Sequence, residues 1–209
     1  MRRFAWAGSF AAAMGLLIAA VAAVAAAQAP ALPDPSGEWT SSIGELSLML
    51  SGDALSFTYA AVFGETAHTC EGAGVAKLAA SGGYEYTDGQ GTVVFSQESD
   101  RLRMEVSQGI ASFCGAGWGH DSLRPAGPPA LKSCSVVVER SHFHAVGSSP
   151  PEARSAYVAR GDRVQAVQVH VLDRADWLLA RFIGPRSTTV GLLRVVDLDC
   201  GKATAGGEQ

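Results

Sequence analysis

The stretch GELSLMLSGDALSFTY, residues 44–59, decides the fold class of this chain. Every second residue is apolar on both sides of a turn at residues 51–53. The apolar positions are Leu46, Leu48, Leu50, Leu55, Phe57 and Tyr59. Because successive side chains of a β-strand point to opposite faces of the sheet, this period of two predicts a hairpin of two half-buried antiparallel strands.

The same kind of pattern continues along the rest of the chain. Leu102, Met104 and Val106 alternate with polar residues, and glycine-containing turns punctuate this half. In the second half, short apolar runs predict strands at residues 136–138, 157–158, 164–171, 177–183 and 188–193. We therefore expect an all-β protein.

Proline-rich segments divide the chain into parts. The sequence PAGPPALK favours a linker over residues 125–132. It separates a β-rich domain at residues 37–124 from a second one at residues 133–202, each a small antiparallel β-barrel or sandwich. A proline-rich leader at residues 28–36 is expected to be extended and mobile, and residues 203–209 are expected to form a flexible tail.

Residues 1–27 have the features of an export signal. Arg2 and Arg3 form a cationic start, an uncharged alanine-rich stretch follows, and small residues precede the cleavage point that we predict after Ala27. A retained membrane anchor is the alternative, because the apolar stretch is long enough to span a bilayer. With no second apolar stretch of that length, we expect no integral membrane domain in the mature chain. Export places that chain in the periplasm or outside the cell, where disulfides form.

The charge balance separates the two halves. The 209 residues include 16 Lys and Arg against 20 Asp and Glu, and the resulting net charge of −4 argues against a nucleic-acid partner. Residues 28–126 hold 12 acidic and 4 basic residues, a net −8, whereas residues 127–209 hold 8 acidic and 10 basic residues, a net +2. The two halves therefore either attract each other or face different partners.

Four cysteines behind an export signal predict two disulfides. Because two cysteines fall in each half, we expect the pairs Cys70–Cys114 and Cys134–Cys200 among the three possible pairings. Each bridge is expected to stabilise its domain by about 4 kcal/mol. The alternative is that Cys114 is a catalytic thiolate beside His120, a role that needs a free sulfur.

The second half resembles a known family in its order of motifs. Residues 156–164 read AYVARGDRV, Trp177 follows in an apolar strand, and residues 188–193 read TTVGLL. These motifs resemble the SH3-like domains of exported bacterial proteins, although Leu192 stands where that family usually has Trp. The resemblance implies a small β-barrel used for binding near the cell wall or protein partners, and no cofactor is expected.

The first half has a fainter resemblance. It rests on GEW at residues 37–39, HTCEGAG at residues 68–74 and FCGAGW at residues 113–118. These segments resemble the β-rich module of exported proteins related to LprI-type lysozyme inhibitors. The Cys-rich helical segment of that inhibitor is absent here, so the resemblance implies a fold and a compartment.

Aromatic side chains are the first candidates for binding. Trp118 lies in the glycine-dense segment 115–119, where it either anchors an exposed recognition loop or caps the end of the barrel. Tyr84 and Tyr86 share one face of a predicted strand, opposite Glu85, and either contact a ligand or cover the core.

Histidines next to acidic residues are the second candidates. The Cys70–Cys114 bridge would bring His68 and Glu65 towards His120 and Asp121, which are either acid–base groups or ordinary turn residues.

The second half adds two weaker candidates. His142 and His144 share a face if their segment is a strand, but no third ligand is close in sequence, so we expect no metal site. Four arginines either contact an anionic surface or are simply solvated. They are Arg154, Arg160, Arg163 and Arg174.

These features favour a non-enzymatic protein of the bacterial cell envelope that binds another protein or a cell-wall component. One concrete hypothesis is an inhibitor or immunity protein against a wall-degrading enzyme, whose basic surface would meet the acidic first half. The alternative is a wall-targeted accessory protein or hydrolase in which the SH3-like half is the targeting module.

Overall fold

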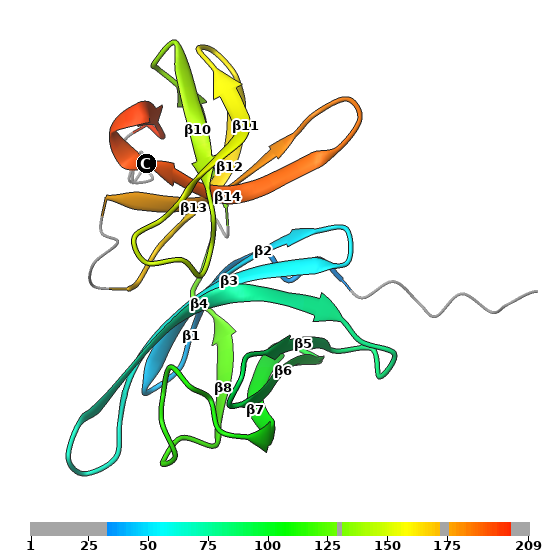
Figure 1. The fold of residues 1–209 in the computed structure, drawn as a ribbon, viewed down its shortest axis with the longest axis vertical. Helices are drawn as coiled ribbons and strands as arrows, with labels where there is room; N and C mark the ends of the chain where they lie inside the picture. The colour runs from blue at the N-terminus through cyan, green and yellow to red at the C-terminus, as the bar shows by residue number, and fades with distance from the viewer. Residues whose placement is uncertain (1–32, 129–130, 172–175, 202–209) are drawn as a thin grey trace, which may run out of the picture. The chain divides into compact units, whose positions relative to one another are not determined.

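The computed structural model describes residues 33–128, 131–171 and 176–201, and it confirms the all-β class (Figure 1). The predicted signal peptide and the predicted tail lie outside these residues. Within the described ranges, the regular structure is β-strand apart from one 3₁₀ turn, η2 (Val195–Asp197). In the same ranges, no helix has the length and apolar character needed to cross a membrane.

The first eight strands close into an antiparallel barrel in which each strand pairs with the next and β1 pairs with β8. These strands are β1 (Gly37–Thr40), β2 (Gly44–Ser51), β3 (Ala54–Phe63), β4 (His68–Leu78), β5 (Tyr84–Thr87), β6 (Gly91–Glu98), β7 (Arg101–Gly109) and β8 (His120–Pro125).

The remaining strands form a second, curled sheet in the order β11-β10-β14-β13-β12-β9-β15. They are β9 (Lys132–Val136), β10 (Arg140–His144), β11 (Ala153–Ala159), β12 (Arg163–Gln168), β13 (Trp177–Ile183), β14 (Thr188–Arg194) and β15 (Leu198–Asp199). The predicted strand at residues 136–138 is wrong in position, because β9 ends at Val136 and the chain then turns into β10. The predicted strand at residues 177–183 coincides with β13.

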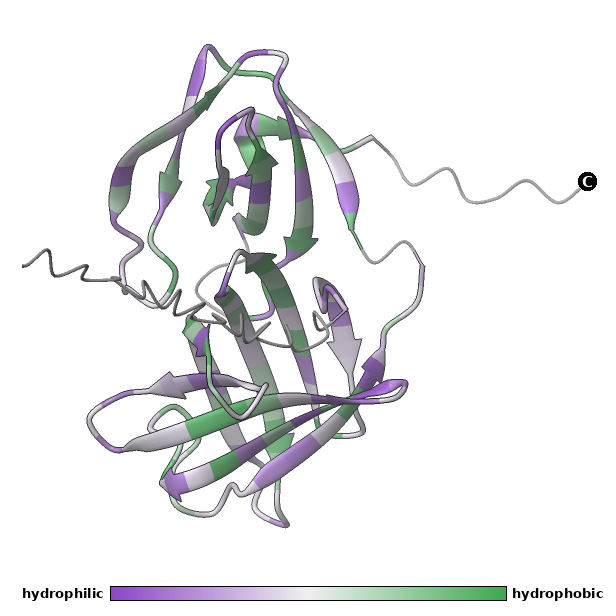
Figure 2. Cartoon of the chain, turned by 90° about the vertical axis from the view of Figure 1, so that its right-hand side faces the viewer, coloured by the Kyte–Doolittle hydropathy of each residue, from purple (hydrophilic) through white to green (hydrophobic). Residues whose placement is uncertain are grey.

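The β2–β3 hairpin has the register that its apolar pattern predicts. Leu48 lies opposite Phe57 and Leu46 opposite Tyr59, and all four side chains are buried inside the barrel. Green and purple bands alternate along the strands in Figure 2 for the same reason. However, Met49 on the other face is also fully buried, so β2 is covered on both sides rather than half-buried.

An aromatic cluster fills the middle of the barrel. The ring of Phe57 packs edge-on against Tyr86 at 5.1 Å and lies tilted against Phe95 at 4.9 Å, measured between ring centroids. Phe113 adds a third ring at 5.9 Å. Aromatic pairs at these distances stabilise a core beyond the effect of their buried area. Side chains therefore occupy the interior of this barrel, and its function has to be sought on its surface.

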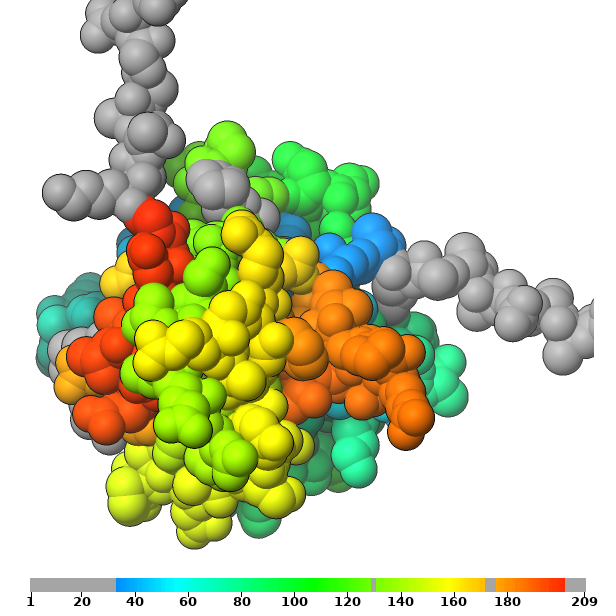
Figure 3. Space-filling view, turned by 90° about the horizontal axis from the view of Figure 1, so that it is seen from above, coloured from blue at the N-terminus to red at the C-terminus, as the bar shows by residue number. Residues whose placement is uncertain are grey.

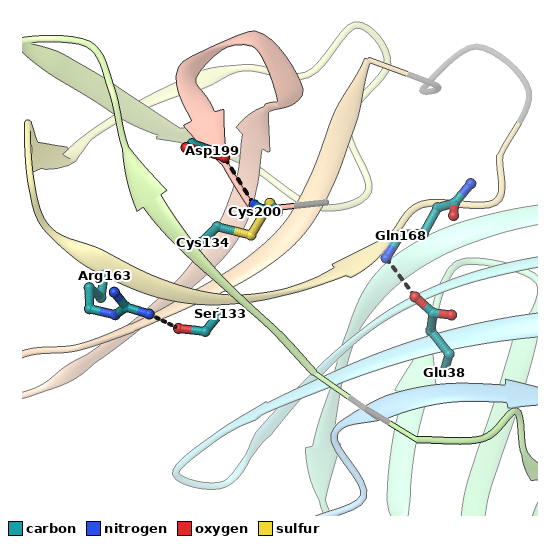
Figure 4. The surroundings of a disulfide bond; sticks show 8 residues. Glu38, Ser133, Cys134, Arg163, Gln168, Asp199 and Cys200 are labelled. Carbon is teal, nitrogen blue, oxygen red and sulfur yellow. Dashed lines mark hydrogen bonds between the residues drawn. A yellow bond between two sulfur atoms is a disulfide. The ribbon is translucent and has the colours of Figure 1, made fainter. Parts of the chain in front are cut away.

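The second sheet has its own core. Phe143, Val158, Val164 and Leu193 are buried in it together with Cys134, which is bonded to Cys200 (Figure 4). This disulfide joins β9 to the residue that follows β15. It therefore ties the first and the last described strands of the second sheet together.

The barrel and the second sheet belong to one compact unit and share an apolar contact. Met49 of β2 packs among Val167, Leu179 and Leu192 of the second sheet. Beside this contact, the hydroxyl of Ser47 donates to the carbonyl oxygen of Gln168 at 2.6 Å. This contact explains why β2 is buried on its outer face.

Polar contacts across the same boundary join acidic residues of the barrel to the second sheet. Glu38 accepts a hydrogen bond from the backbone N–H of Gln168 at 3.1 Å (Figure 4). Glu45 lies 2.9 Å from the imidazole of His170, measured from Oε2 to Nδ1. The uneven charge predicted either that the two halves attract each other or that they face different partners. These contacts support attraction between the halves.

The end of the leader is anchored, so its predicted mobility is wrong for residues 33–36; residues 28–32 lie outside the described part. Asp34 accepts a 2.9 Å bond from Nη1 of Arg181, and Arg181 is mostly buried. The hydroxyl of Ser36 accepts from the backbone N–H of Leu50 at 2.8 Å, and the indole of Trp39 donates to the carbonyl of Pro35 at 2.9 Å. Sequence composition could not show that Asp34 contacts Arg181, because the two residues lie far apart in the chain.

The Asp34–Arg181 contact predicts a pH-dependent stability. Burial alone would raise the pKa of Asp34, but hydrogen bonds from Ser36 and the charge of Arg181 outweigh burial and hold the pKa below its ordinary value. A carboxyl whose pKa is lowered by folding adds stability above its unfolded pKa, and this stability is lost as the pH falls through the folded value. Asp34→Asn should therefore be less stable than wild type at pH 7, and the difference should shrink towards about pH 3.

Urea unfolding of both proteins over this pH range checks this prediction. Glu98→Gln, on an exposed residue with no ion pair within the described residues, is the matched control. A stability difference between wild type and Asp34→Asn that stays constant with pH would contradict the role of this contact.

Candidate recognition surface

The β3–β4 hairpin extends beyond its neighbour β2 at one end of the barrel (Figure 1). The pairing of β2 with β3 stops at Gly44 and Ala61, whereas β3 and β4 continue to pair as far as Phe63 and His68. We call residues 62–69 the hairpin arm. No third strand of the described part of the chain pairs with the arm, and its residues are exposed apart from the partly buried Phe63.

The exposed residues of the hairpin arm combine apolar and polar groups. Val62 is 52% exposed, which is high for an apolar side chain. Glu65 and His68 are exposed, and the His68 ring lies 5.8 Å from the ring of Phe63. A small apolar patch with polar groups at its rim is the usual composition of a protein-binding surface.

A glycine-rich loop lies beside the hairpin arm. We call residues 115–119 the glycine loop. A methyl group built on Gly117 would lie 3.6 Å from the ring of Phe63, so the loop and the arm are neighbours. Gly115 has a φ of +77°, a conformation that favours glycine. Gly117 and Gly119 are exposed and carry no side chain, so the backbone at these two positions faces solvent directly.

Both ends of the glycine loop are fixed. The Cys70–Cys114 disulfide holds its start against β4, and the backbone N–H of Glu71 donates to the carbonyl of Phe113 at 3.2 Å. Near its end, Trp118 is buried at 4% exposure with its ring 5.9 Å from that of Tyr59. This bracing reduces the freedom that the loop would lose on binding.

Of the two alternatives for Trp118, an exposed anchor or a cap over the end of the barrel, the structure supports the cap. Its large apolar side chain covers the end of the barrel over Tyr59, where burial removes more apolar area from water than an exposed position would. For Tyr84 and Tyr86, the structure likewise supports the alternative in which they cover the core. Tyr84 is 6% exposed and Tyr86 packs on Phe57, so their shared face is the inner one and Glu85 faces solvent.

Asp121 is part of a buried polar contact that the sequence does not reveal. The hydroxyl of Tyr59 donates to Oδ2 of Asp121 at 2.8 Å, and the hydroxyl of Ser41 donates to the same oxygen at 2.9 Å. Burial, followed by the neighbouring carboxylate of Asp121, raises the pKa of Tyr59. These hydrogen bonds join β3, β8 and the turn after β1 beneath the Trp118 side chain.

The predicted constellation of His68, Glu65, His120 and Asp121 forms only in part. His120 is exposed and Asp121 is buried, because successive residues of β8 point to opposite faces. Glu65 and His68 share the hairpin arm, and His120 directly follows the glycine loop. Within the described residues no hydrogen bond or ion pair joins these side chains, so an acid–base pair is not assembled.

A cleft of about 400 Å³ runs beside the hairpin arm. The acidic residues Glu45 and Glu71 line it, and so does the apolar Val62. His170, which follows β12, also lines the cleft and contacts Glu45 there. The hairpin arm, the glycine loop and this cleft together make an acidic, partly apolar surface.

Both predicted disulfides are present, which overturns the alternative of a catalytic thiolate. Cys114 is bonded to Cys70, so its sulfur is not free, and no free cysteine occurs among the described residues.

The two histidines of the second half have different surroundings, since His142 is exposed and His144 is partly buried. The Nδ1–H of His142 donates to the carbonyl oxygen of Arg154 at 3.1 Å, and the ring of His144 packs against that of Trp177 at 4.5 Å. No group of three or more potential metal ligands was found within the described ranges. Arg154, Arg160 and Arg163 lie at the surface, and Arg174 lies outside the described residues.

Comparison with known proteins identifies no relative: no family model, no curated protein and no solved structure matches this chain. The surface around the hairpin arm therefore has to be interpreted from its own chemistry.

Proposed function

We propose that this chain is an exported, non-enzymatic binding protein of the bacterial cell envelope, and that it inhibits a basic wall-degrading enzyme through the hairpin arm and the glycine loop. The observation that best supports this function is the exposed Glu65 on the hairpin arm, which extends beyond β2. The arm lies next to a cleft lined by Glu45 and Glu71. Export is supported by the predicted signal peptide, and the two disulfides fit an oxidising compartment.

The charges of the barrel suit a basic partner. Residues 28–126 carry a net charge of −8, and only part of this charge is used inside the protein. Asp34 and Glu38 contact the second sheet, and Asp121 is buried. The carboxylates that remain at the surface steer a positively charged enzyme towards the barrel and disfavour acidic proteins.

The shape and rigidity of the surface suit inhibition. An enzyme that cleaves a polymer has an open groove, and a projecting hairpin is the kind of element that fits a groove. The Cys70–Cys114 bridge and the buried Trp118 hold the arm and the glycine loop in place before binding. Little conformational entropy is then lost in the complex, which favours tight binding.

Replacing the carboxylates of the arm and of the cleft tests the proposal. The double variant Glu65→Gln/Glu71→Gln is expected to bind a basic c-type lysozyme at least about ten-fold more weakly than wild type. The measurement is isothermal titration calorimetry at low and at high salt, with lysozyme activity on wall fragments followed in parallel. The wild-type affinity should fall as salt increases, because exposed charges are screened.

Glu85→Gln is the control, because Glu85 is, like Glu65, an exposed barrel carboxylate, but it lies on β5 and does not line the cleft beside the arm. It should bind lysozyme almost as well as wild type. If Glu85→Gln and the double variant lose affinity equally, binding depends on overall charge, and the assignment to the hairpin arm is wrong.

A further inference from the structure

The outer face of the β10–β11 pair carries a second surface that the proposed function does not use. Tyr157 of β11 is 48% exposed, whereas its neighbour Val158 is buried in the core. His142 lies directly opposite Tyr157 on β10, with the two ring centroids 5.7 Å apart. These strands, coloured lime to yellow, lie in the open face seen in Figure 3.

Arg140 is held on this surface by its contact with the tyrosine ring. Its guanidinium carbon lies 4.2 Å from the centroid of the Tyr157 ring, a cation–π arrangement. Among the described residues no carboxylate lies within ion-pair distance of Arg140, although Glu139 precedes it in sequence and is also exposed. A cation–π contact does not use the N–H donors of a guanidinium in hydrogen bonds, so they stay available for an anion.

His142 is oriented by the backbone. Its Nδ1 lies 3.1 Å from the carbonyl oxygen of Arg154, and because a carbonyl only accepts, Nδ1 carries the proton of this bond. The other ring nitrogen, Nε2, is then the acceptor of the neutral imidazole. Arg140, Tyr157 and His142 therefore offer, side by side, an anion-binding fork, an aromatic surface and a hydrogen-bond acceptor. We call these three residues the β10–β11 platform.

We propose that the β10–β11 platform binds a carboxylate-bearing saccharide. A carboxylate matches the two parallel N–H groups of the Arg140 fork, and the apolar face of a sugar ring suits the exposed part of the Tyr157 ring. A sugar hydroxyl supplies the donor that Nε2 of His142 accepts. The charge of the second half supports an anionic ligand, since residues 127–209 carry a net +2 while the barrel is acidic.

Titration with an oligogalacturonate tests this site, with the uncharged galactose oligomer of the same length as the comparison probe. Wild type is expected to bind the oligogalacturonate with a dissociation constant of about 1 mM or lower, and to bind the neutral oligomer at least about ten-fold more weakly. Tyr157→Ala and Arg140→Gln should each weaken binding by about ten-fold. Both side chains lie at the surface, so these variants should keep the unfolding curve of wild type.

Arg186→Gln is the matched control, because Arg186 is an exposed arginine in the turn between β13 and β14. It should bind the oligogalacturonate like wild type, and so should Glu65→Gln/Glu71→Gln, which separates this site from the lysozyme-binding surface. Unchanged affinity in Tyr157→Ala would overturn the proposal. Equal binding of inorganic phosphate would also overturn it, since the site would then recognise a bare anion rather than a saccharide.

Discussion

The double variant Cys70→Ala/Cys114→Ala is expected to have a free energy of unfolding about 4 kcal/mol lower than that of wild type. The bridge joins cysteines with a sequence separation of 44 and so restricts the conformations of the unfolded chain. Its removal raises the conformational entropy of the unfolded chain, which lowers the free energy of unfolding. In the folded protein, the same bridge holds the start of the glycine loop against β4. Urea unfolding measures the loss of stability, and calorimetry with lysozyme should show weaker binding.

The double variant Cys134→Ala/Cys200→Ala is the control for this experiment. Its bridge has a sequence separation of 66 and its removal is also expected to cost about 4 kcal/mol, but it lies in the second sheet. This variant should keep the affinity for lysozyme under conditions where it is folded. If both variants lost binding to the same extent, stability alone would govern binding and the glycine loop would have no special role.

Trp118→Ala is expected to lower the free energy of unfolding by about 3 to 5 kcal/mol, because a buried tryptophan is lost and a cavity remains over Tyr59. Trp118→Phe keeps an aromatic ring over Tyr59 and should cost clearly less. Urea unfolding followed by far-ultraviolet circular dichroism checks both values, since this signal does not depend on the tryptophan itself.

Binding separates the two possible roles of Trp118. If the residue braces the glycine loop from inside the barrel, Trp118→Phe should bind lysozyme nearly as well as wild type. If Trp118 instead touched the partner, the conservative variant would lose affinity while remaining stable. The second result would contradict the interpretation that Trp118 is buried and supports the recognition surface from inside the barrel.

Local patterns predicted the parts of the fold that depend on neighbouring residues. Alternation in residues 44–59 predicted the β2–β3 hairpin and the inward positions of Leu48 and Phe57, since the period of two belongs to a single strand. The number of cysteines in each half predicted both disulfides. These features need no knowledge of what lies across the sheet.

Features that depend on distant segments could not be predicted in this way. Met49 sits on the face that alternation assigns to solvent, and it is buried because β12, β13 and β14 cover it. Asp34 is anchored by Arg181, which lies in β13. Composition shows neither partner, because a contact across 147 residues depends on the packing of two sheets.

The sequence predicted where the candidate site lies, but not which side chains it exposes. His68 and the glycine segment do lie at one end of the barrel, joined by the Cys70–Cys114 bridge. Trp118 points inward there, because an indole gains more from covering Tyr59 than from exposure to water. The exposed groups are carboxylates and Val62, and the signal that could have found them is the uneven charge of the two halves.

Titration of the full mature chain into a basic c-type lysozyme is the most direct test of the central claim, which is that the acidic barrel binds and inhibits a basic wall-degrading enzyme. The proposal predicts saturable one-to-one binding that weakens with salt, together with loss of lysozyme activity on wall fragments. Full lysozyme activity and no heat of binding, repeated with other basic wall hydrolases, would contradict it.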